Sequence, residues 1–242
     1  MGKKKQLSQT FSYFNKTPFE TEKNESPILK YVFEEITRCM LQGIKKGIAV
    51  DLGCNNGKYT SQLALYFEEI FGLDYAEKAL FSAPKKQNIT YEVIDLNINA
   101  NKLLKYRNVD KYVAIAIFEL LENPEDVIRN ISLSLRQGGD LFIVIPNNKS
   151  LNFLSFRFLL LLKRWMGREA ENIYNNGINL KKINKILSEN GFEITKSDKI
   201  IASPVYLINC LPALVQTLIV KIDPLLLKIS GGGYKCLIAT KK

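Results

Sequence analysis

Histidine is absent from the 242 residues of this chain. Its absence excludes Ser-His-Asp and Cys-His catalysis and every metal site that depends on imidazole. The sequence has only four cysteines, Cys39, Cys54, Cys210 and Cys236, and they form no C-x-x-C pair. This spacing favours neither a zinc site nor a dithiol centre, and we expect no bound metal. The sequence also lacks a signal peptide, so we expect a protein of the reducing cytoplasm.

The overall composition is that of a folded, basic protein. Hydrophobic residues make up 46% of the chain, which is enough for a substantial core. Lysine and arginine number 34 against 24 acidic residues, giving a formal charge of +10. Such a charge favours an anionic partner, which could be a membrane, a nucleic acid or a phosphorylated substrate.

Short apolar runs alternate with helix-like segments along most of the sequence. Strands are expected near residues 47–52, 70–73, 89–94, 112–117, 141–145, 192–200 and 235–240. Helices are expected near residues 28–41, 58–67, 76–83, 101–106, 124–135 and 180–190. This alternation predicts an α/β fold: a doubly wound, mainly parallel seven-stranded sheet with helices on both faces. Residues 1–27 are predicted to form a flexible arm before a single domain over residues 28–242.

The most informative stretch is Ala49 to Ala64, AVDLGCNNGKYTSQLA. A strand, a Gly-containing loop and a helix follow one another, as in nucleotide-binding turns. Gly53 and Gly57 permit tight turns, and Asn55 tolerates a positive φ. Lys58 stands where a dinucleotide fingerprint has its last glycine, and Gly57-Lys58 is not followed by Ser or Thr, which excludes a Walker loop.

Acidic residues end three successive predicted strands. Asp51 beside the loop would repel a pyrophosphate but attract an ammonium group. Asp74 is placed to accept hydrogen bonds from both hydroxyls of a ribose. Asp95 is placed to accept one from an exocyclic adenine amine. This set predicts a ligand that combines an amino acid with a nucleoside.

These residues resemble the motifs of class I S-adenosylmethionine-dependent methyltransferases. AVDLGCNNG is similar to the D-x-G-x-G-x-G motif of that family. VAIAIFELLENPEDVIRNISLSLRQGGDLFIVIPN resembles its fourth-strand and fifth-strand segments, and LKKINKILSENGFEI the helix and turn before its sixth strand. The resemblance extends from about Ile28 to the C-terminus and implies that S-adenosyl-L-methionine is the cofactor.

The resemblance also assigns roles to individual residues. It implies that Asp51 and Gly53 hold the methionine end, Asp74 the ribose, and Asp95 with Leu96 the adenine. The remaining candidate cofactor-binding residues are the loop residues Cys54, Asn55 and Gly57, then Tyr75, and the segment Ala116, Ile117 and Phe118, which would line the sulfonium.

The segment after the fourth strand departs from the family pattern. Many relatives read E-x-x-E-H there, whereas this chain reads Glu119-Leu120-Leu121-Glu122-Asn123. A hydroxyl acceptor would benefit from a general base, for which Glu119 and Glu122 are the candidates, on one face if the segment is helical. Either could instead cap the next helix or contact solvent. Tyr13, Tyr174 and Lys58 are weaker candidates.

Two apolar segments are expected to form a helical lid, over residues 150–178 and 203–232. Basic residues and Trp165 flank the first segment, and no charged residue occurs between Ile200 and Val220. Such segments could lie in a membrane interface, cover a greasy substrate, or pack against the sheet or a homodimer partner.

Several functions remain open from the sequence. The leading hypothesis is a small-molecule methyltransferase, acting through oxygen on an apolar, quinone-like or lipid-like acceptor or on a natural product or sugar. The alternatives are an RNA methyltransferase, disfavoured because the basic residues are dispersed, and a non-catalytic cofactor-binding scaffold. A nicotinamide-dependent reductase fits Asp51 and Lys58 least well.

Overall fold

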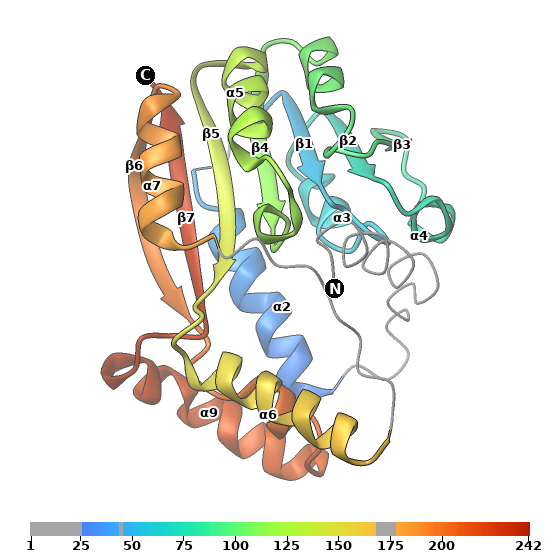
Figure 1. The fold of residues 1–242 in the computed structure, drawn as a ribbon. Coiled ribbons are helices and arrows are strands. Elements are labelled where there is room, and N and C mark those ends of the chain that lie inside the picture. Colours follow the sequence, from blue (N-terminus) through green and yellow to red (C-terminus); the bar gives the residue numbers. More distant parts are fainter. Residues whose placement is uncertain (1–25, 44–45, 168–177) are drawn as a thin grey trace.

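The protein is represented by a computed structural model that describes residues 26–43, 46–167 and 178–242. Its centre is a seven-stranded sheet in the order β3-β2-β1-β4-β5-β7-β6 (Figure 1). The first five strands pair in parallel, and β7 runs antiparallel to both of its neighbours. The predicted doubly wound α/β fold is confirmed.

All seven predicted strands are present, with somewhat different ends. Their bounds are β1 Ile48–Leu52, β2 Glu69–Asp74, β3 Ile89–Val93, β4 Val109–Ile115, β5 Leu135–Pro146, β6 Phe192–Ile200 and β7 Tyr234–Lys241. β4 was predicted to continue to Ile117 but ends at Ile115, because Ala116 adopts a φ of 53°. That left-handed conformation is incompatible with a continuing strand.

The helices of the described residues surround this sheet. They are α2 Pro27–Met40, α3 Thr60–Leu63, α4 Glu77–Phe81, η1 Ala100–Lys105, η2 Phe118–Leu120, α5 Pro124–Ser134, α6 Leu151–Trp165, α7 Leu180–Glu189, α8 Val205–Ile208 and α9 Ala213–Ile229. The helix predicted over 58–67 is a single α-turn, because the N–H groups of Glu68 and Glu69 already bind the carbonyl of Gly47 to begin β2. The helix predicted over 101–106 is a 3₁₀ helix, a form common in such short segments.

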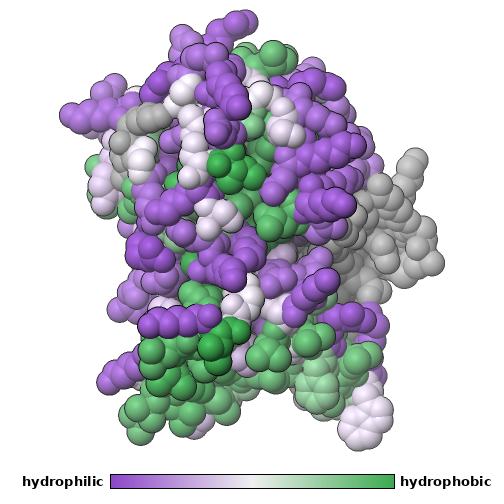
Figure 2. Space-filling view, turned by 90° about the vertical axis from the view of Figure 1, so that its left-hand side faces the viewer, coloured by the Kyte–Doolittle hydropathy of each residue, from purple (hydrophilic) through white to green (hydrophobic). Residues whose placement is uncertain are grey.

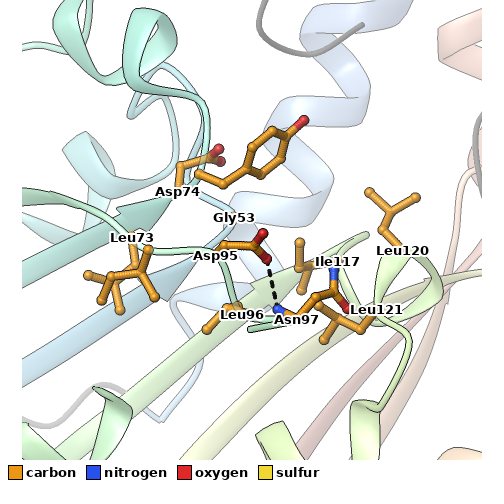
Figure 3. A pocket seen from close by; sticks show the side chains of 11 residues that line it. Gly53, Leu73, Asp74, Asp95, Leu96, Asn97, Ile117, Leu120 and Leu121 are labelled. Carbon is orange, nitrogen blue, oxygen red and sulfur yellow. Dashed lines mark hydrogen bonds between the residues drawn. The ribbon is translucent and has the colours of Figure 1, made fainter. Parts of the chain in front are cut away.

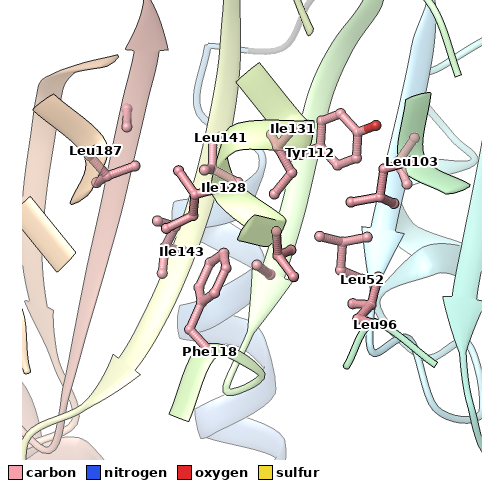
Figure 4. Packing of buried hydrophobic residues seen from close by; sticks show 14 of the residues in the cluster. Leu52, Leu96, Leu103, Tyr112, Phe118, Ile128, Ile131, Leu141, Ile143 and Leu187 are labelled. Carbon is pink, nitrogen blue, oxygen red and sulfur yellow. The ribbon is translucent and has the colours of Figure 1, made fainter. Parts of the chain in front are cut away.

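Alternate residues of the central strands enter two separate cores. Tyr112 and Ile143 belong to the core under α5 and α7 (Figure 4), whereas Val113 and Phe142 belong to the core under α2 and α8. Because side chains of a strand point alternately to opposite faces, both faces of the sheet are covered. This double burial explains why the strand segments read as nearly continuous apolar runs.

The carboxyl ends of the parallel strands meet at the lower edge in Figure 1, and α6 and α9 lie beyond that edge. These two helices and α8 fall within the segments predicted to form a lid, whereas residues 168–177 and residues 1–25 of the predicted arm lie outside the described residues. The arm was predicted over residues 1–27, but Pro27 already begins α2. That these segments act as a lid stays a prediction. Among the described helices, none combines the length and apolar character needed to cross a bilayer.

Candidate functional site

The three acids predicted to form a site lie at one edge of the sheet. Asp51 lies in β1, Asp74 is the last residue of β2, and Asp95 follows β3 closely. These strands are neighbours and parallel, so their carboxyl ends lie together. In open α/β sheets this edge is where ligands bind.

The loop after β1 is held tightly against the end of β2. The N–H groups of Gly53 and Cys54 both donate to the carbonyl of Leu73, at 2.8 and 3.1 Å. Asn55 donates its N–H to Oδ2 of Asp74 at 2.8 Å, and it does so from a left-handed conformation with φ 49°. The predicted positive φ of Asn55 is thus present, and it lets the loop turn without a third glycine.

Gly53 is also needed for close packing. It has a φ of 68°, and a Cβ at this position would lie 2.9 Å from Cδ1 of Ile117. A larger residue would therefore collide with the segment after β4. The glycine brings the loops after β1 and β4 into direct contact.

A pocket opens between the loops that follow β1, β2, β3 and β4 (Figure 3). Its lining includes six of the predicted cofactor-binding residues: Gly53, Asp74, Tyr75, Asp95, Leu96 and Ile117. Five further lining residues were not predicted: Leu73, Ile94, Asn97, Leu120 and Leu121. The pocket combines two carboxylates with a largely apolar wall, and none of the described residues that line it is a lysine or an arginine.

Asn97 connects two sides of this pocket. Its N–H donates to Oδ1 of Asp95 at 2.9 Å (Figure 3), and its own Oδ1 accepts the N–H of Glu122 at 2.7 Å. The loop after β3 is thereby tied to the segment after β4. The Asp-Leu-Asn sequence was a signal for this turn, since Asp and Asn side chains often bind nearby backbone groups.

Asp74 is buried and does structural work of its own. Besides Asn55, it binds the N–H of Ala76 through Oδ1 at 2.8 Å. Burial raises the pKa of Asp74, and these backbone N–H groups lower it. Each carboxylate oxygen has a further lone pair, so Asp74 can still accept hydrogen bonds from a ligand.

Asp51 does not line the pocket. Its carboxyl group is 2% exposed and accepts a hydrogen bond from the Thr60 hydroxyl at 2.6 Å. Burial raises the pKa of Asp51 to about 7, the Thr60 hydrogen bond lowers it, and the charge of Asp74 raises it. Asp51 contacts Thr60, the first residue of α3, and is not part of the pocket wall. Its expected contact with the methionine end of the cofactor stays a prediction.

The other predicted cofactor residues lie around the pocket without lining it. Phe118, 1% exposed, is part of the core cluster in Figure 4, and its expected place beside the sulfonium stays a prediction. Cys54 is buried, and Ala116 forms the left-handed turn after β4. At Gly57 a Cβ would lie 2.3 Å from the hydroxyl of Tyr91, so this glycine admits the tyrosine.

The sequence allowed the two candidate bases to share one face of a helix, but in the structure they do not belong to the same helix. Glu119 lies within η2, but this helix ends at Leu120, and Glu122 lies beyond it. Glu119 is 6% exposed, and its Oε2 has no hydrogen-bond partner among the described residues. Burial raises the pKa of Glu119 to about 7, although its backbone N–H lowers it. A buried carboxyl group with a pKa near 7 is able to accept a proton near neutral pH.

Of the three weaker base candidates, the structure describes only Lys58, and it lies elsewhere. The ammonium of Lys58 lies 4.1 Å from the centre of the Phe33 ring, on the side of α2. Tyr13 and Tyr174 lie outside the described residues.

A second polar group lies near Glu119 and was not predicted. It contains Tyr234 at the start of β7, Asn152 in α6 and Tyr206 in α8. Burial raises the pKa of Tyr234, contacts with the side chains of Asn152 and Tyr206 lower it, and the charge of Glu119 raises it. Asn152 is buried, and its Oδ1 lacks a hydrogen-bond partner within the described part of the chain.

The glycines before Tyr234 allow this arrangement. A Cβ at Gly233 would lie 2.9 Å from the carbonyl of Ile201 and 3.1 Å from Cβ of Asn152. The run Gly231-Gly232-Gly233 was the sequence signal for such close backbone contact. Glu119 and Asn152 thus each keep a buried oxygen that has no hydrogen-bond partner among the described residues.

The pocket fits the nucleoside part of S-adenosylmethionine. Leu96 and Leu121 offer an apolar wall to a purine, and Asp74 and Asp95 offer acceptors to ribose hydroxyls and an amine. The lining formed by the described residues lacks the cations that a pyrophosphate needs, which disfavours a dinucleotide.

The family comparison identifies the kind of domain. Residues 50–143 match the model of a family described as "Methyltransferase domain". No curated protein matches the chain.

Solved structures with the same fold extend over the whole chain. A Thermotoga maritima methyltransferase, described as a possible histamine N-methyltransferase, has a TM-score of 0.63 and 15% identity over 98% of this chain and 99% of its own. Magnesium protoporphyrin IX methyltransferase from Synechocystis, with bound S-adenosylhomocysteine, has a TM-score of 0.62 and 16% identity over 98% and 100%. The N-methyltransferase NodS from Bradyrhizobium japonicum, with the same ligand, has a TM-score of 0.59 and 15% identity over 96% and 97%.

Residues 50–143 therefore carry a methyltransferase domain, and the chain has the fold of the S-adenosylmethionine-dependent methyltransferases among these solved structures.

Proposed function

We propose that this enzyme methylates a hydroxyl oxygen of a small, largely apolar molecule, with Glu119 as the general base. The observation that carries the proposal is the buried Glu119 carboxylate, whose Oε2 has no hydrogen-bond partner among the described residues. A hydroxyl must lose its proton as it is methylated, whereas an aromatic amine, which is neutral at pH 7, can react through its free lone pair. An orphan carboxylate therefore favours an oxygen acceptor.

S-adenosylmethionine supplies an electrophilic methyl group on a sulfonium. Asp74, Asp95 and Leu96 would hold its nucleoside, while Gly53 and Ile117 would bound the methionine side of the pocket. The acceptor oxygen forms a bond to the methyl carbon as the sulfur–carbon bond breaks, and that electron pair stays on sulfur. The hydroxyl proton moves to Oε2 of Glu119. Alignment accounts for most of the rate, since well-oriented groups reach effective molarities of about 10⁵–10⁸ M.

The acceptor would lie between Glu119 and the aromatic side chains beside it. Tyr206 packs its ring against Phe156, with centroids 4.8 Å apart, and it contacts Tyr234, whose pKa is also raised by the charge of Glu119. These residues offer apolar area and a few polar contacts, which is the usual make-up of a small-molecule site. They do not form the long basic groove that an RNA substrate needs. Small-molecule substrates also appear in the names of the Thermotoga and Synechocystis neighbours.

Glu119→Gln tests this function, because it keeps the shape of the side chain but cannot take up a proton. We expect kcat to fall by about 10²-fold or more, with unchanged affinity for S-adenosylhomocysteine by calorimetry. Formation of S-adenosylhomocysteine would be followed with a panel of phenols, quinols and alkyl alcohols and their matched amines. Glu122→Gln is the control, and we expect it to retain most of the activity.

The pH profile gives a second measure of the same role. Only the carboxylate form of Glu119 can accept a proton, so kcat should rise through a pKa of about 7 and level off above it. This rise of kcat with pH cannot come from the titration of a histidine, because the chain has none. Two results would contradict oxygen methylation assisted by Glu119. One is faster methylation of the amines than of the matched hydroxyl compounds, and the other is the same rise of kcat with pH in Glu119→Gln. Turnover on RNA alone, or none on any acceptor, would favour the RNA methyltransferase or the scaffold.

A further inference from the structure

Helix α9 is amphipathic, but it buries polar residues and exposes apolar ones. Its buried residues are the polar Gln216 and Asp223. Its exposed side includes a row of large apolar residues at spacings of three and four: Leu214, Leu218, Ile222, Leu225 and Ile229. Residues with this spacing lie on one face of a helix, and in a water-soluble helix that face is normally turned to the core.

The polar side of α9 is turned inward by specific hydrogen bonds. Asp223 is 0% exposed and accepts the N–H groups of Ala202 and Ser203, at 3.1 and 2.7 Å, and the Tyr31 hydroxyl at 3.1 Å. Gln216 accepts the N–H of Ile28 at 3.2 Å. The helix is thus fixed with its apolar row outward, so the exposure is built into the fold.

Helix α6 has the same inverse pattern. Its buried residues include Asn152 and Ser155. Its exposed side carries five apolar residues at spacings of three and four: Leu151, Leu154, Phe158, Leu161 and Trp165. Trp165, at 85% exposure, is the single tryptophan of the chain.

The two rows lie at the same end of the molecule. In Figure 1 α6 and α9 both lie beyond the carboxyl ends of the strands, and α8 packs against α6. Figure 2 shows hydrophobic residues gathered at this end, whereas the surface above them is mainly hydrophilic. We call the ten residues of the two rows the apolar face. A contiguous patch of this kind marks an interaction site.

The charges on these helices are all of one sign at the surface. Arg157 and Arg164 on α6, and Lys221 and Lys228 on α9, are exposed beside the rows. The only acidic residue of either helix is the fully buried Asp223. The surface charge therefore complements an anionic partner, and a second copy docking through the same face would bring like charges together.

We propose that the apolar face docks on an anionic lipid bilayer, with α6 and α9 lying in the plane of the interface. Apolar side chains would enter the boundary between headgroups and acyl chains, while the arginines and lysines meet lipid phosphates. Neither helix is able to span the bilayer, so the attachment is peripheral. This inference is independent of the acceptor chemistry proposed above.

Vesicle sedimentation tests the proposal with the full chain. Phosphatidylcholine vesicles with and without phosphatidylglycerol would be compared, and emission from Trp165 would be recorded on the same samples. We expect binding to the anionic vesicles only at low salt, with a blue shift of the tryptophan emission as Trp165 leaves water.

Variants then locate the contact. Leu161→Ser with Leu218→Ser removes one apolar side chain from each row and should weaken binding about tenfold or more. The matched control is Phe81→Ser with Leu133→Ser, two exposed apolar residues on α4 and α5 that should leave binding unchanged. Binding of S-adenosylhomocysteine by each variant checks that it is folded and does not depend on the membrane.

Three results would overturn the proposal. They are failure of the wild type to bind anionic vesicles, equal binding by both double variants, and an unshifted Trp165 emission on bound protein. Light scattering that shows a dimer abolished by Leu161→Ser with Leu218→Ser, without vesicle binding, would assign the face to a second copy and equally refute the membrane.

Discussion

Asp74 illustrates how one residue can prepare the pocket before any ligand arrives. Its two oxygens bind the N–H groups of Asn55 and Ala76, which fixes the loop after β1 and the start of the segment leading to α4. The same carboxylate lines the pocket. A ligand that uses its remaining lone pairs meets an acceptor already held in place, so little ordering is needed on binding.

Asp74→Asn should weaken the binding of S-adenosylhomocysteine by about 1–3 kcal/mol, because one oxygen becomes a donor and the ribose hydroxyls lose an acceptor. The same change should loosen the contact with either Asn55 or Ala76. Titration calorimetry measures the affinity. Glu77→Gln, an exposed change three residues along the chain, is the control and should bind normally. Equal affinities for the two variants would show that Asp74 does not contact the nucleoside.

The residues of the pocket differ in how far the sequence could predict them. Asp74, Asp95 and Gly53 are identified by their positions at strand ends, because the backbone alone brings those positions together. Tyr234 and Asn152 come from elements far apart in the sequence, and only the pairing of β5 with β7 and the course of α6 bring them toward Glu119. No local spacing reports a contact of that kind. The burial of Glu119 is likewise a property of the folded chain.

At the scale of helices, Asp223 is the residue that orients α9. It gathers donors from α2 and from the segment after β6, so one carboxylate connects three parts of the molecule. Burial raises the pKa of its partner Tyr31, and the charge of Asp223 raises it further. The tyrosine therefore remains a donor to Asp223 throughout the physiological range.

Asp223→Ala should lower the free energy of unfolding by about 3 kcal/mol, since several buried donors lose their acceptor. Asp223→Asn keeps one acceptor oxygen and should cost less. Urea denaturation followed by circular dichroism measures both. Lys228→Ala, exposed on the same helix, should change the value by no more than about 0.5 kcal/mol. A loss for Asp223→Ala as small as that for Lys228→Ala would mean that α9 is oriented by other contacts.

The same helices show the limit of hydrophobic patterning. The strands and most helices follow from apolar periodicity, and the alternation of residues between the two cores accounts for that success. Periodicity identifies an apolar face but not what it packs against. In α6 and α9 the apolar face is outward, because Asn152, Gln216 and Asp223 are buried by hydrogen bonds and close packing that the sequence does not reveal.

For the molecule as a whole, the buried acids control how stability depends on pH near neutrality, because the chain has no histidine. Burial raises the pKa of Asp51 and of Glu119 to about 7, from ordinary values near 4. Between those values the folded state binds more protons than the unfolded state. Stability therefore falls as pH rises through this window and becomes level above about pH 7. No histidine titration overlaps with the effect.

We therefore expect the free energy of unfolding, without ligand, to decrease from about pH 5.5 to pH 8, by about 2 kcal/mol for each of the two acids. Asp51→Asn and Glu119→Gln should each remove part of this slope, since neither side chain can ionise. Glu125→Gln, a change at an exposed position of α5, should leave the slope as it is. Urea unfolding at several pH values gives the measurement. A slope that is zero or positive in the wild type would mean that these carboxyls are ionised at little cost, and Glu119 would then lose its suitability as a base near neutral pH.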